Sequence, residues 1–306
     1  MTRRIIFFAW ITVVALSVCL AHDLSAQEMK SGEINWVKGY ISAVGNGTAD
    51  PSGNKVKDRL KSLRAAELVA QRTLLETLKG VRIDSTTTVE NLMLKEDIIN
   101  SRVEGVIRGA QIVKRDVTWE GNVPLATVEM RVCLSMNVGG CSMDSSLITA
   151  LNIGHRSEPR YVPGDRLNPQ TIPLTPPPKT PPKNIKYDSS KPVTGVIFTL
   201  EGRPFERQLL PVIITVAGES KRITVYSVKN VTPKVIRSFG VVRYADNEDQ
   251  AKKNPYIGDN AVVIPVEDIT KENMIVIGTD GVRAIRETTM HGNNYLSDAK
   301  VVISSD

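Results

Sequence analysis

Aromatic residues, histidine and cysteine are all scarce in this chain of 306 residues. Aromatic side chains make up 5% of it, and it holds three histidines and three cysteines. The folded cores must therefore consist largely of valine, isoleucine and leucine. Cys133 and Cys141 have no nearby histidine or third cysteine that would complete a zinc-ligand set, so metal binding through this pair is not expected.

Long hydrophobic runs are also missing, with one exception near the N-terminus. Arg3 and Arg4 precede an apolar stretch over residues 5–21, and the small residues Ser25 and Ala26 follow shortly after it. A basic start, a short apolar stretch and a small-residue exit are typical of a secretory signal peptide. We therefore expect residues 1–26 to direct export, with cleavage between Ala26 and Gln27 and a periplasmic mature protein.

The excess of positive charge does not indicate a nucleic-acid partner. The formal net charge is +6, but most of the excess falls within residues 155–192. Nucleic-acid-binding domains usually carry a clustered basic patch on a folded face. A solvated connecting segment is the better interpretation, and we expect no nucleic-acid binding.

Proline is concentrated in the same segment. Ten of the seventeen prolines lie between residues 155 and 192. Proline lacks an amide proton and has a fixed φ, so such a segment favours extended geometry and acts as a semi-rigid spacer. It divides the chain into a signal peptide (1–26), a first domain (27–154), a linker (155–192) and a second domain (193–306). A docking site for a module that binds proline-rich peptides is the alternative use of this segment.

The hydrophobic patterns predict an α+β fold with two domains. In the first domain, leucines and alanines at spacings of three and four predict a long helix over 55–79 that ends at Gly80. The small residues Ala66 and Ala70 would let this helix approach a sheet closely. The full stripe is Leu60, Leu63, Ala66, Ala70, Leu74 and Leu78. We expect strands at 34–45, 81–89, 103–117 and 125–134 and a second, short helix at 91–100. This order predicts a helix-covered, mostly antiparallel sheet.

The second domain is expected to be of mixed α/β type. Its strand candidates are β-branched and short, and its helices are short and capped by polar residues. Expected strands are 193–200, 211–216, 222–227, 261–266, 274–278 and 300–303, with helices at 246–253 and 279–286.

Two cysteines remain in the processed chain, Cys133 and Cys141. In an oxidising compartment such a pair usually forms a disulfide. Two glycines between them give the backbone freedom to turn back, so we expect a clip at a strand exit. Two free thiols are the alternative.

Several polar residues were considered as sites. Gly45 and Gly47 follow a strand and precede a helix, but they lack the further glycine or lysine of a phosphate loop, which favours an ordinary turn. His22, His155 and His291 lie near no nucleophile or metal-ligand partner. Glu67 lies near the apolar helix stripe, where a boundary ion pair with Arg64 is favoured over catalysis.

The alternative function would depend on acidic residues at strand ends of the second domain. Asp259 and Asn260 precede a strand, and Asp280 follows one. A turn or a helix cap explains each of them. If they converged on one pocket, an envelope hydrolase or a small-ligand-binding protein would be indicated.

Three stretches of the first domain resemble a known family. These are Gly39 to Gly47, Arg64 to Gly80 and Val103 to Ala110, which give a Gly-rich strand end, an Ala-rich helix that closes on Gly, and a strand with a spaced Gly. They resemble the LPP-twenty-like bacterial lipoprotein domain and are similar to the N-terminal part of the flagellar assembly protein T group. Stretches of the second domain resemble the region that accompanies that domain in some envelope proteins.

The resemblance implies a non-enzymatic cell-envelope protein that acts through protein–protein contacts and uses no cofactor. Its expected partners are outer-membrane or other envelope proteins, including flagellar ring components. A lipid anchor would require Cys19, but Val18 stands where the lipidation motif has a small residue, so cleavage after Ala26 is favoured. The candidate partner surface comprises Trp36, Tyr40, Gly45 and Gly47.

Overall fold

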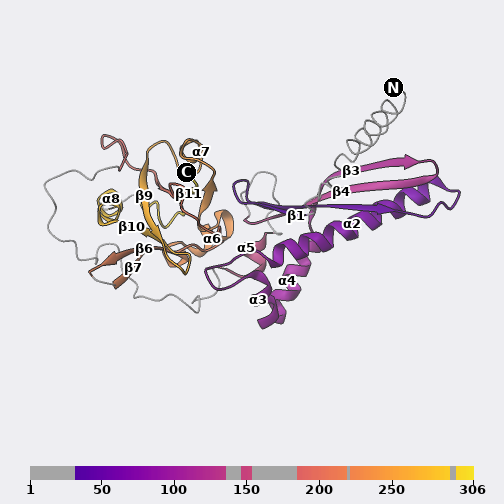
Figure 1. The fold of residues 1–306 in the computed structure, drawn as a ribbon, viewed down its shortest axis with the longest axis horizontal. Helices are drawn as coiled ribbons and strands as arrows, with labels where there is room; N and C mark the ends of the chain where they lie inside the picture. The colour runs from indigo at the N-terminus through magenta and orange to yellow at the C-terminus, as the bar shows by residue number, and fades with distance from the viewer. Residues whose placement is uncertain (1–31, 136–145, 154–184, 219–220, 290–293) are drawn as a thin grey trace, which may run out of the picture. The chain divides into compact units, whose positions relative to one another are not determined.

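The computed structural model describes residues 32–135, 146–153, 185–218, 221–289 and 294–306. Within these ranges the chain forms two sheets, one from residues 32–133 and one from residues 195–304. Helices accompany both sheets (Figure 1).

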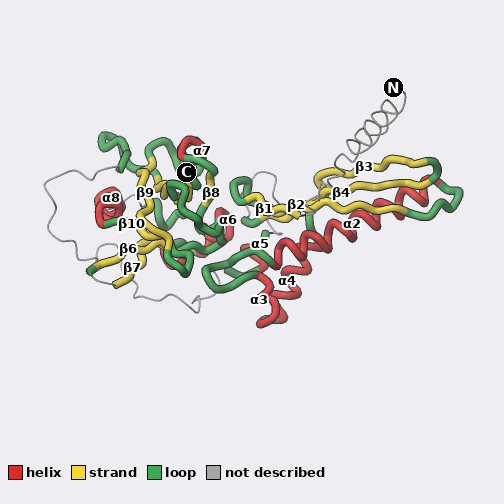
Figure 2. Tube along the Cα trace, in the orientation of Figure 1, coloured by secondary structure: helices red, strands yellow, loops and turns green. Residues whose placement is uncertain are grey.

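The N-terminal sheet is antiparallel throughout and has the strand order β1-β2-β4-β3. Its two hairpins are β1–β2 and β3–β4, and β2 pairs with β4 in the centre. Helix α2 runs along one face of this sheet (Figure 2). The strands are β1 (Gly32–Asn35), β2 (Tyr40–Thr48), β3 (Gln111–Glu120) and β4 (Val123–Cys133).

Helix α2 (Lys55–Lys79) has the predicted bounds, and Gly80 is its C-cap as predicted. Asn54 caps its first turn by accepting hydrogen bonds from two backbone N–H groups. The buried residues recur at every fourth position, which gives a narrower stripe than expected. Leu60 was wrongly assigned to it, since 62% of this residue is exposed. The buried stripe is Asp58, Ser62, Ala66, Ala70, Leu74 and Leu78.

Gly45 and Gly47 lie within β2, so the predicted turn at these positions is wrong. A Cβ atom at Gly45 would lie 2.2 Å from the carbonyl oxygen of Ala66, and one at Gly47 would lie 2.3 Å from the backbone nitrogen of Ala66. Glycine is the residue that permits such close backbone approach. The close approach of helix to sheet expected from Ala66 and Ala70 is confirmed.

Residues 81–88 form a loop with one isolated bridge and residues 89–108 are largely helical, which corrects the strand predicted at 81–89 and the first part of the one predicted at 103–117. The helices are α3 (Val89–Lys95) and α4 (Asp97–Arg108), and strand structure begins only at Gln111. The apolar residues Ile99, Val103 and Ile107 recur every four residues on the buried side of α4. Helical spacing therefore outweighed the β-branched composition, which is a weak preference that packing overrides.

The predicted strand at 34–45 is a hairpin instead. The chain turns at residues 36–39, where Gly39 has a φ of 71° and its N–H donates to the carbonyl of Asn35 over 2.7 Å. The hairpin predicted at residues 120–122 is confirmed, with Gly121 at a φ of 62° between β3 and β4.

The C-terminal sheet has seven strands in the order β7-β6-β10-β9-β5-β11-β8. Its parallel pairs are β6–β10, β9–β5, β5–β11 and β11–β8, while β6–β7 and β9–β10 are antiparallel. The sheet is therefore mixed, as expected. The strands are β5 (Gly195–Thr199), β6 (Ile213–Ala217), β7 (Lys221–Tyr226), β8 (Arg243–Ala245), β9 (Ala261–Ile269), β10 (Ile275–Ile277) and β11 (Val301–Ser304).

Short helices complete the C-terminal part. Helices α7 (Glu248–Lys252) and α8 (Thr279–Thr289) correspond to the predicted ones, although Asn247 and not Asp246 caps α7. Helix α6 (Pro233–Phe239), the 3-10 turn η2 (Val228–Asn230) and strand β8 were not predicted. Helix α5 (Leu147–Ala150) packs between α4 and α6.

The predicted α+β class, with an antiparallel N-terminal sheet and a mixed C-terminal sheet, is confirmed. The division into domains stays a prediction, because residues 154–184 lie outside the described ranges. Residues 185–192 at the end of the predicted linker already lie against β9, where Lys186 pairs with Val263. Among the described helices, none combines the length and apolar character that a membrane span requires.

Candidate functional site: a cleft beside the β1–β2 turn

A cleft of about 750 Å³ opens beside the turn that joins β1 to β2. Volumes of this order are typical of ligand-binding clefts. One wall comes from the N-terminal sheet, and the other comes from α6, β8 and the chain after α7. The lining residues are Trp36, Val37, Lys38, Gly39, Tyr40, Arg131, Leu134, Ser135, Ile148, Gln208, Leu209, Phe239, Gly240, Val241, Val242, Arg243, Tyr244, Asn254, Pro255 and Tyr256.

The first wall carries two half-buried aromatic side chains. Trp36 lies edge-on to Tyr244, with ring centroids 5.5 Å apart. Tyr40 begins β2, and the guanidinium carbon of Arg131 in β4 lies 3.8 Å from its ring centroid. Because Tyr40 and Cys133 are paired in register, Tyr40 and Arg131 are diagonal neighbours on one face of the sheet. That face is opposite to the one covered by α2.

The second wall is built around Arg243. Its guanidinium carbon lies 4.3 Å from the ring centroid of Tyr256, and Tyr256 stacks on Phe239 at 4.4 Å. Nη1 of Arg243 donates to the carbonyl of Phe239 over 2.8 Å. Burial lowers the pKa of Arg243 below its usual value and raises the pKa of Tyr256 to about 12. With a pKa of about 12, Tyr256 is uncharged at neutral pH.

Tyr244 closes the inner end of the cleft. Its hydroxyl accepts a hydrogen bond from the backbone N–H of Gln208 over 3.0 Å and donates one to the carbonyl of the same residue over 2.7 Å. Burial raises the pKa of Tyr244 well above its usual value. A single hydroxyl thus pairs both backbone groups of Gln208, which is fully buried.

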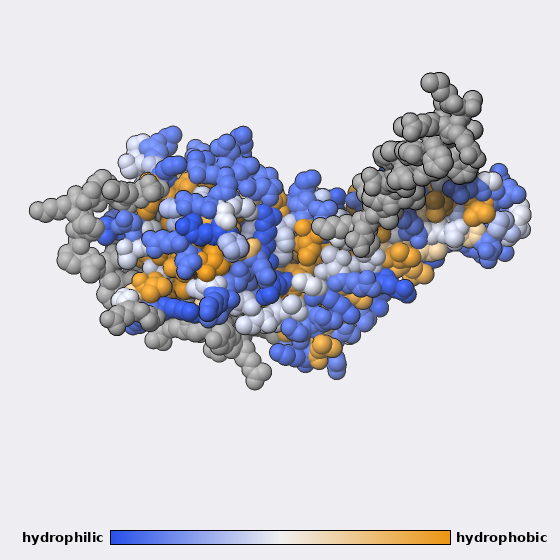
Figure 3. All heavy atoms as spheres, viewed as in Figure 1, coloured by the Kyte–Doolittle hydropathy of each residue, from blue (hydrophilic) through white to orange (hydrophobic). Residues whose placement is uncertain are grey.

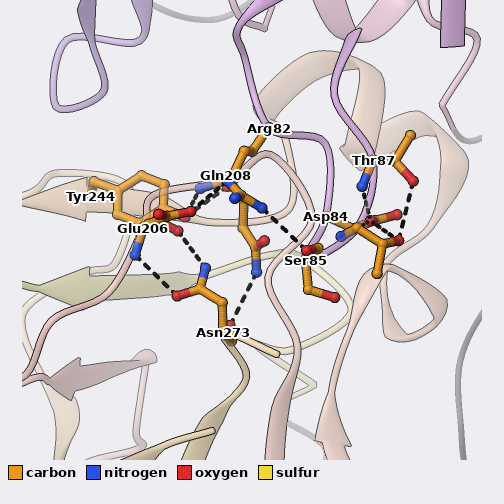
Figure 4. A network of polar contacts seen from close by, with 9 residues as sticks. Arg82, Asp84, Ser85, Thr87, Glu206, Gln208, Tyr244 and Asn273 are labelled. Carbon is orange, nitrogen blue, oxygen red and sulfur yellow. Dashed lines mark hydrogen bonds and ion pairs between the residues drawn. The ribbon is translucent and has the colours of Figure 1, made fainter. Parts of the chain in front are cut away.

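A polar network extends from Gln208 on the side away from the cleft (Figure 4). Asn273 exchanges two hydrogen bonds with the backbone of Glu206, at 3.0 and 2.7 Å, and its carbonyl accepts from Nε2 of Gln208. The carboxylate of Glu206 forms an ion pair with Arg82, which also donates to the carbonyl of Ser85. Asp84 accepts hydrogen bonds from two threonines of the same loop.

Main-chain bonds join the same two segments. The N–H groups of Leu209 and Leu210 donate to the carbonyls of Arg82 and Ile83, over 3.0 and 2.8 Å. Residues 206–210 therefore form hydrogen bonds with three parts of the fold. These are the loop after α2, Asn273, and Tyr244 in the cleft.

The cleft is positively charged. Lys38, Arg131 and Arg243 line it, and among the residues that the structure describes no aspartate or glutamate does. None of these three cations forms an ion pair with a carboxylate in the described ranges. By contrast, Arg207, which lies behind Tyr244, is paired with Asp246 at 3.0 Å.

The candidate partner surface is divided by the fold. Trp36 and Tyr40 are half-buried and line the cleft. Gly45 and Gly47 lie under α2 on the opposite face of the sheet and do not contribute to this surface. Residues Cys19, Ala26, Gln27 and Cys141 lie outside the described ranges, so the cleavage site, the lipid anchor and the disulfide stay predictions. Cys133 is buried at the end of β4.

The acidic residues of the alternative function do not converge. The Asn260 side chain accepts from the N–H of Asp188 and donates to the carbonyls of Asp188, Lys191 and Pro192, so it holds residues 188–192 in place. Asp280 pairs with Arg283 in the first turn of α8, and Asp259 is exposed beside Gly258. Asp259 lies at a bend, as expected from the sequence, while Asp280 is the second residue of α8, and none of the three residues is in the cleft lining.

Two further expectations concern charged residues. Glu67 pairs with Arg64 at 3.4 Å and with Arg115 of β3 at 2.8 Å, so the predicted boundary ion pair is confirmed. In the ranges that the structure covers, no group of three or more histidine, cysteine or acidic residues is arranged to hold a metal ion. His22, His155 and His291 are not in those ranges.

Sequence reasoning missed Arg131, Arg243, Tyr244 and Tyr256. Their signal is a cation or aromatic residue at the end of a strand or beside a short helix, which has no periodicity of its own. Arg243 and Tyr244 also belong to a strand of three residues, β8, that was not predicted.

The fold is of the α+β class, and it forms a ligand-sized cleft lined by cationic and aromatic side chains. Residues 195–306 match the family model described as the second domain of Treponema pallidum Tp0624. This match covers β5 to the end of the chain and does not include the N-terminal sheet. No curated protein matches the chain.

Proposed function

We propose that this protein is a non-enzymatic, exported component of the bacterial cell envelope that binds a protein partner at the cleft. The observation that carries the proposal is the cleft itself, which combines five aromatic side chains with cations that form no ion pair among the described residues. Aromatic residues and arginine are enriched in protein interfaces because they combine apolar area with directed hydrogen bonds. The signal-like N-terminus and the resemblance to envelope domains support the location.

The match to Tp0624 supports a modular organisation. The matched model is the second domain of its protein, and here it covers residues 195–306. The face drawn in Figure 3 is mostly hydrophilic, with separate apolar patches. A partner held in a defined cleft fits such a surface better than association through one broad apolar face.

Site-specific photo-cross-linking in intact cells tests the proposal. A photoreactive phenylalanine analogue replaces Lys38, which is exposed at the rim of the cleft, and the matched control replaces Leu94, which is 81% exposed in α3. We expect one envelope protein to be cross-linked at Lys38 and not at Leu94, with the cross-linked peptide identified by mass spectrometry. Absence of an adduct at Lys38, or the same adducts at both positions, would contradict the proposal.

The location has its own test. Osmotic-shock fractionation should release the processed protein with the periplasmic fraction, and N-terminal sequencing should begin at Gln27. Incorporation of a palmitate analogue that depends on Cys19 would replace this expectation with a lipid anchor.

A further inference from the structure

The guanidinium group of Arg131 has no hydrogen-bond acceptor among the described residues. Its Nε is buried and has no hydrogen-bond partner. No described residue accepts a hydrogen bond from its terminal nitrogens, and the Tyr40 ring covers one face of its plane. A buried donor left unpaired costs about 1–3 kcal/mol, and more when it is charged. The group is therefore held in a position that an additional acceptor would stabilise.

Arg243 repeats this arrangement on the opposite wall. It uses one nitrogen on the carbonyl of Phe239 and lies against the ring of Tyr256, and no carboxylate of the described chain neutralises it. The Tyr256 hydroxyl donates a hydrogen bond to the backbone carbonyl of Asp298. The carboxylate of Asp298 forms no ion pair with Arg243. Partly buried charge without a counter-charge is unfavourable, so this wall too would gain from a bound anion.

Other carboxylates of the N-terminal sheet do not supply the missing charge. Glu129 lies two residues before Arg131 in β4, and Glu33 lies in β1 opposite Ser42, the β2 residue that is paired with Arg131. Neither lines the cleft, and neither forms an ion pair with Arg131. By contrast, most described arginines outside the cleft form an ion pair with a carboxylate, for example Arg115 with Glu67 and Arg222 with Glu272.

We propose that the cleft binds an acidic peptide segment of the partner protein, with carboxylates held by Arg131 and Arg243 and apolar side chains against the aromatic walls. This inference rests on the proposed function. The planar guanidinium group matches a carboxylate through two parallel hydrogen bonds, and stacking on an aromatic ring fixes its plane beforehand. The apolar lining, which includes Leu134, Val241 and Pro255, suits a ligand with an apolar body better than a bare inorganic anion.

Calorimetric titration of the purified full chain tests this ligand class. The probes are an acetylated and amidated hexapeptide of alternating phenylalanine and glutamate, and its counterpart with glutamine in place of glutamate. We expect the glutamate peptide to bind at least about tenfold more tightly, because charge-assisted hydrogen bonds are about twice as strong as neutral ones. We also expect its affinity to fall as salt is raised.

Matched variants assign the charge. Arg131→Gln and Arg243→Gln should each weaken binding of the glutamate peptide about tenfold and leave the glutamine peptide unaffected. Lys38→Gln changes an exposed side chain of the same cleft. It takes the place of a buried arginine variant in this comparison if that variant fails to fold. The control is Arg59→Gln, an exposed arginine of α2 that does not line the cleft, and it should bind as the parent protein does.

Several outcomes would overturn the inference. Equal binding of the two peptides, or binding of neither, would exclude an acidic segment as the ligand. Inorganic phosphate bound as tightly as the glutamate peptide would reduce the cleft to a general anion site. Binding to phosphatidylglycerol vesicles that is lost in both arginine variants would assign it to lipid. If the Lys38 cross-link forms while the peptides fail, the ligand class is wrong and the proposed function stands. If the cross-link also fails, both are wrong.

Discussion

Gly45 and Gly105 are both glycines inside regular structure, and their surroundings give opposite expectations. A Cβ at Gly45 would lie 2.2 Å from Ala66 O and 2.3 Å from Ala70 N, both main-chain atoms of α2. A Cβ at Gly105, within α4, would have no atom within 4 Å. The first glycine is required by contact with a rigid backbone, whereas the second only weakens its helix.

Alanine at these two positions should therefore change stability in opposite directions. Gly45→Ala should lower the free energy of unfolding by about 3 kcal/mol or more, because helix and strand must move apart. Gly105→Ala should raise it by about 0.5–1 kcal/mol through the lower entropy of the unfolded chain. Urea unfolding followed by circular dichroism measures both, and equal effects of the two substitutions would show that α2 does not press on β2.

At the scale of the element, the start of α2 depends on a buried carboxylate. Asp58 is 2% exposed, and its oxygens accept hydrogen bonds from the hydroxyl and the N–H of Ser52, at 2.6 and 2.9 Å. These hydrogen bonds lower the pKa of Asp58 below its usual value. They tie the loop before the helix to its first turn, together with the Asn54 cap.

The stability supplied by Asp58 should depend on pH. Because the pKa is lower in the folded state than in the unfolded state, the contribution is fully present above the ordinary aspartate pKa of about 3.9. It is lost as the pH falls through the lower, folded-state value. Asp58→Asn should therefore be less stable than the parent protein at neutral pH, and the difference should shrink in acid below about pH 4.

Thermal unfolding between pH 3 and pH 7 measures this difference. Asp50→Asn is the matched control, since Asp50 is exposed just before the same loop and has no hydrogen-bond partner among the described residues. Its difference from the parent should be small throughout. A gap for Asp58→Asn that is constant across this range would contradict the assigned role.

Elements with a long hydrophobic pattern were predicted from the sequence more accurately than elements with a short one. Helix α2 is 25 residues long and its stripe recurs along most of it, so its bounds and its Gly80 cap were correct. The helix α4 failed because Val103, Val106 and Ile107 are residues common in strands, and their helical spacing covers only 12 residues. The β1–β2 turn was missed because Gly39, its left-handed residue, was interpreted as part of a continuous strand.

The cleft was beyond sequence reasoning for another reason. Trp36 and Tyr40 were proposed as part of a partner surface because they lie in one short segment, and the cleft that they line was not predicted. Arg131, Arg243 and Tyr256 reach the same cleft through pairing between distant strands and through the packing of α6, and no local pattern encodes such long-range neighbours.

At the scale of the whole molecule, two kinds of polar contact hold residues 206–208 against other parts of the fold. The ion pair of Arg82 with Glu206 is partly exposed, with 36% and 65% of the side chains accessible. Pairs of this kind contribute about 0–1 kcal/mol. The Tyr244 hydroxyl satisfies two buried backbone groups of Gln208, and a buried group left unpaired costs about 1–3 kcal/mol.

The hydroxyl should therefore matter more than the charge. Tyr244→Phe should lower the free energy of unfolding by about 1–3 kcal/mol, while Glu206→Gln should change it by less than about 1 kcal/mol. Denaturant titration at low and high salt measures both. A larger loss for Glu206→Gln, reduced by salt, would mean that electrostatics dominate this junction.

The bonds from Leu209 and Leu210 to the carbonyls of Arg82 and Ile83 use main-chain atoms only. Nineteen of the twenty amino acids carry the N–H that each bond requires. Relatives of this chain can therefore exchange the side chains at 209 and 210 for others of similar bulk and keep the junction. Proline cannot occupy either position, because it lacks the N–H group. We therefore expect selection to exclude proline at this junction and to conserve no particular side chain there.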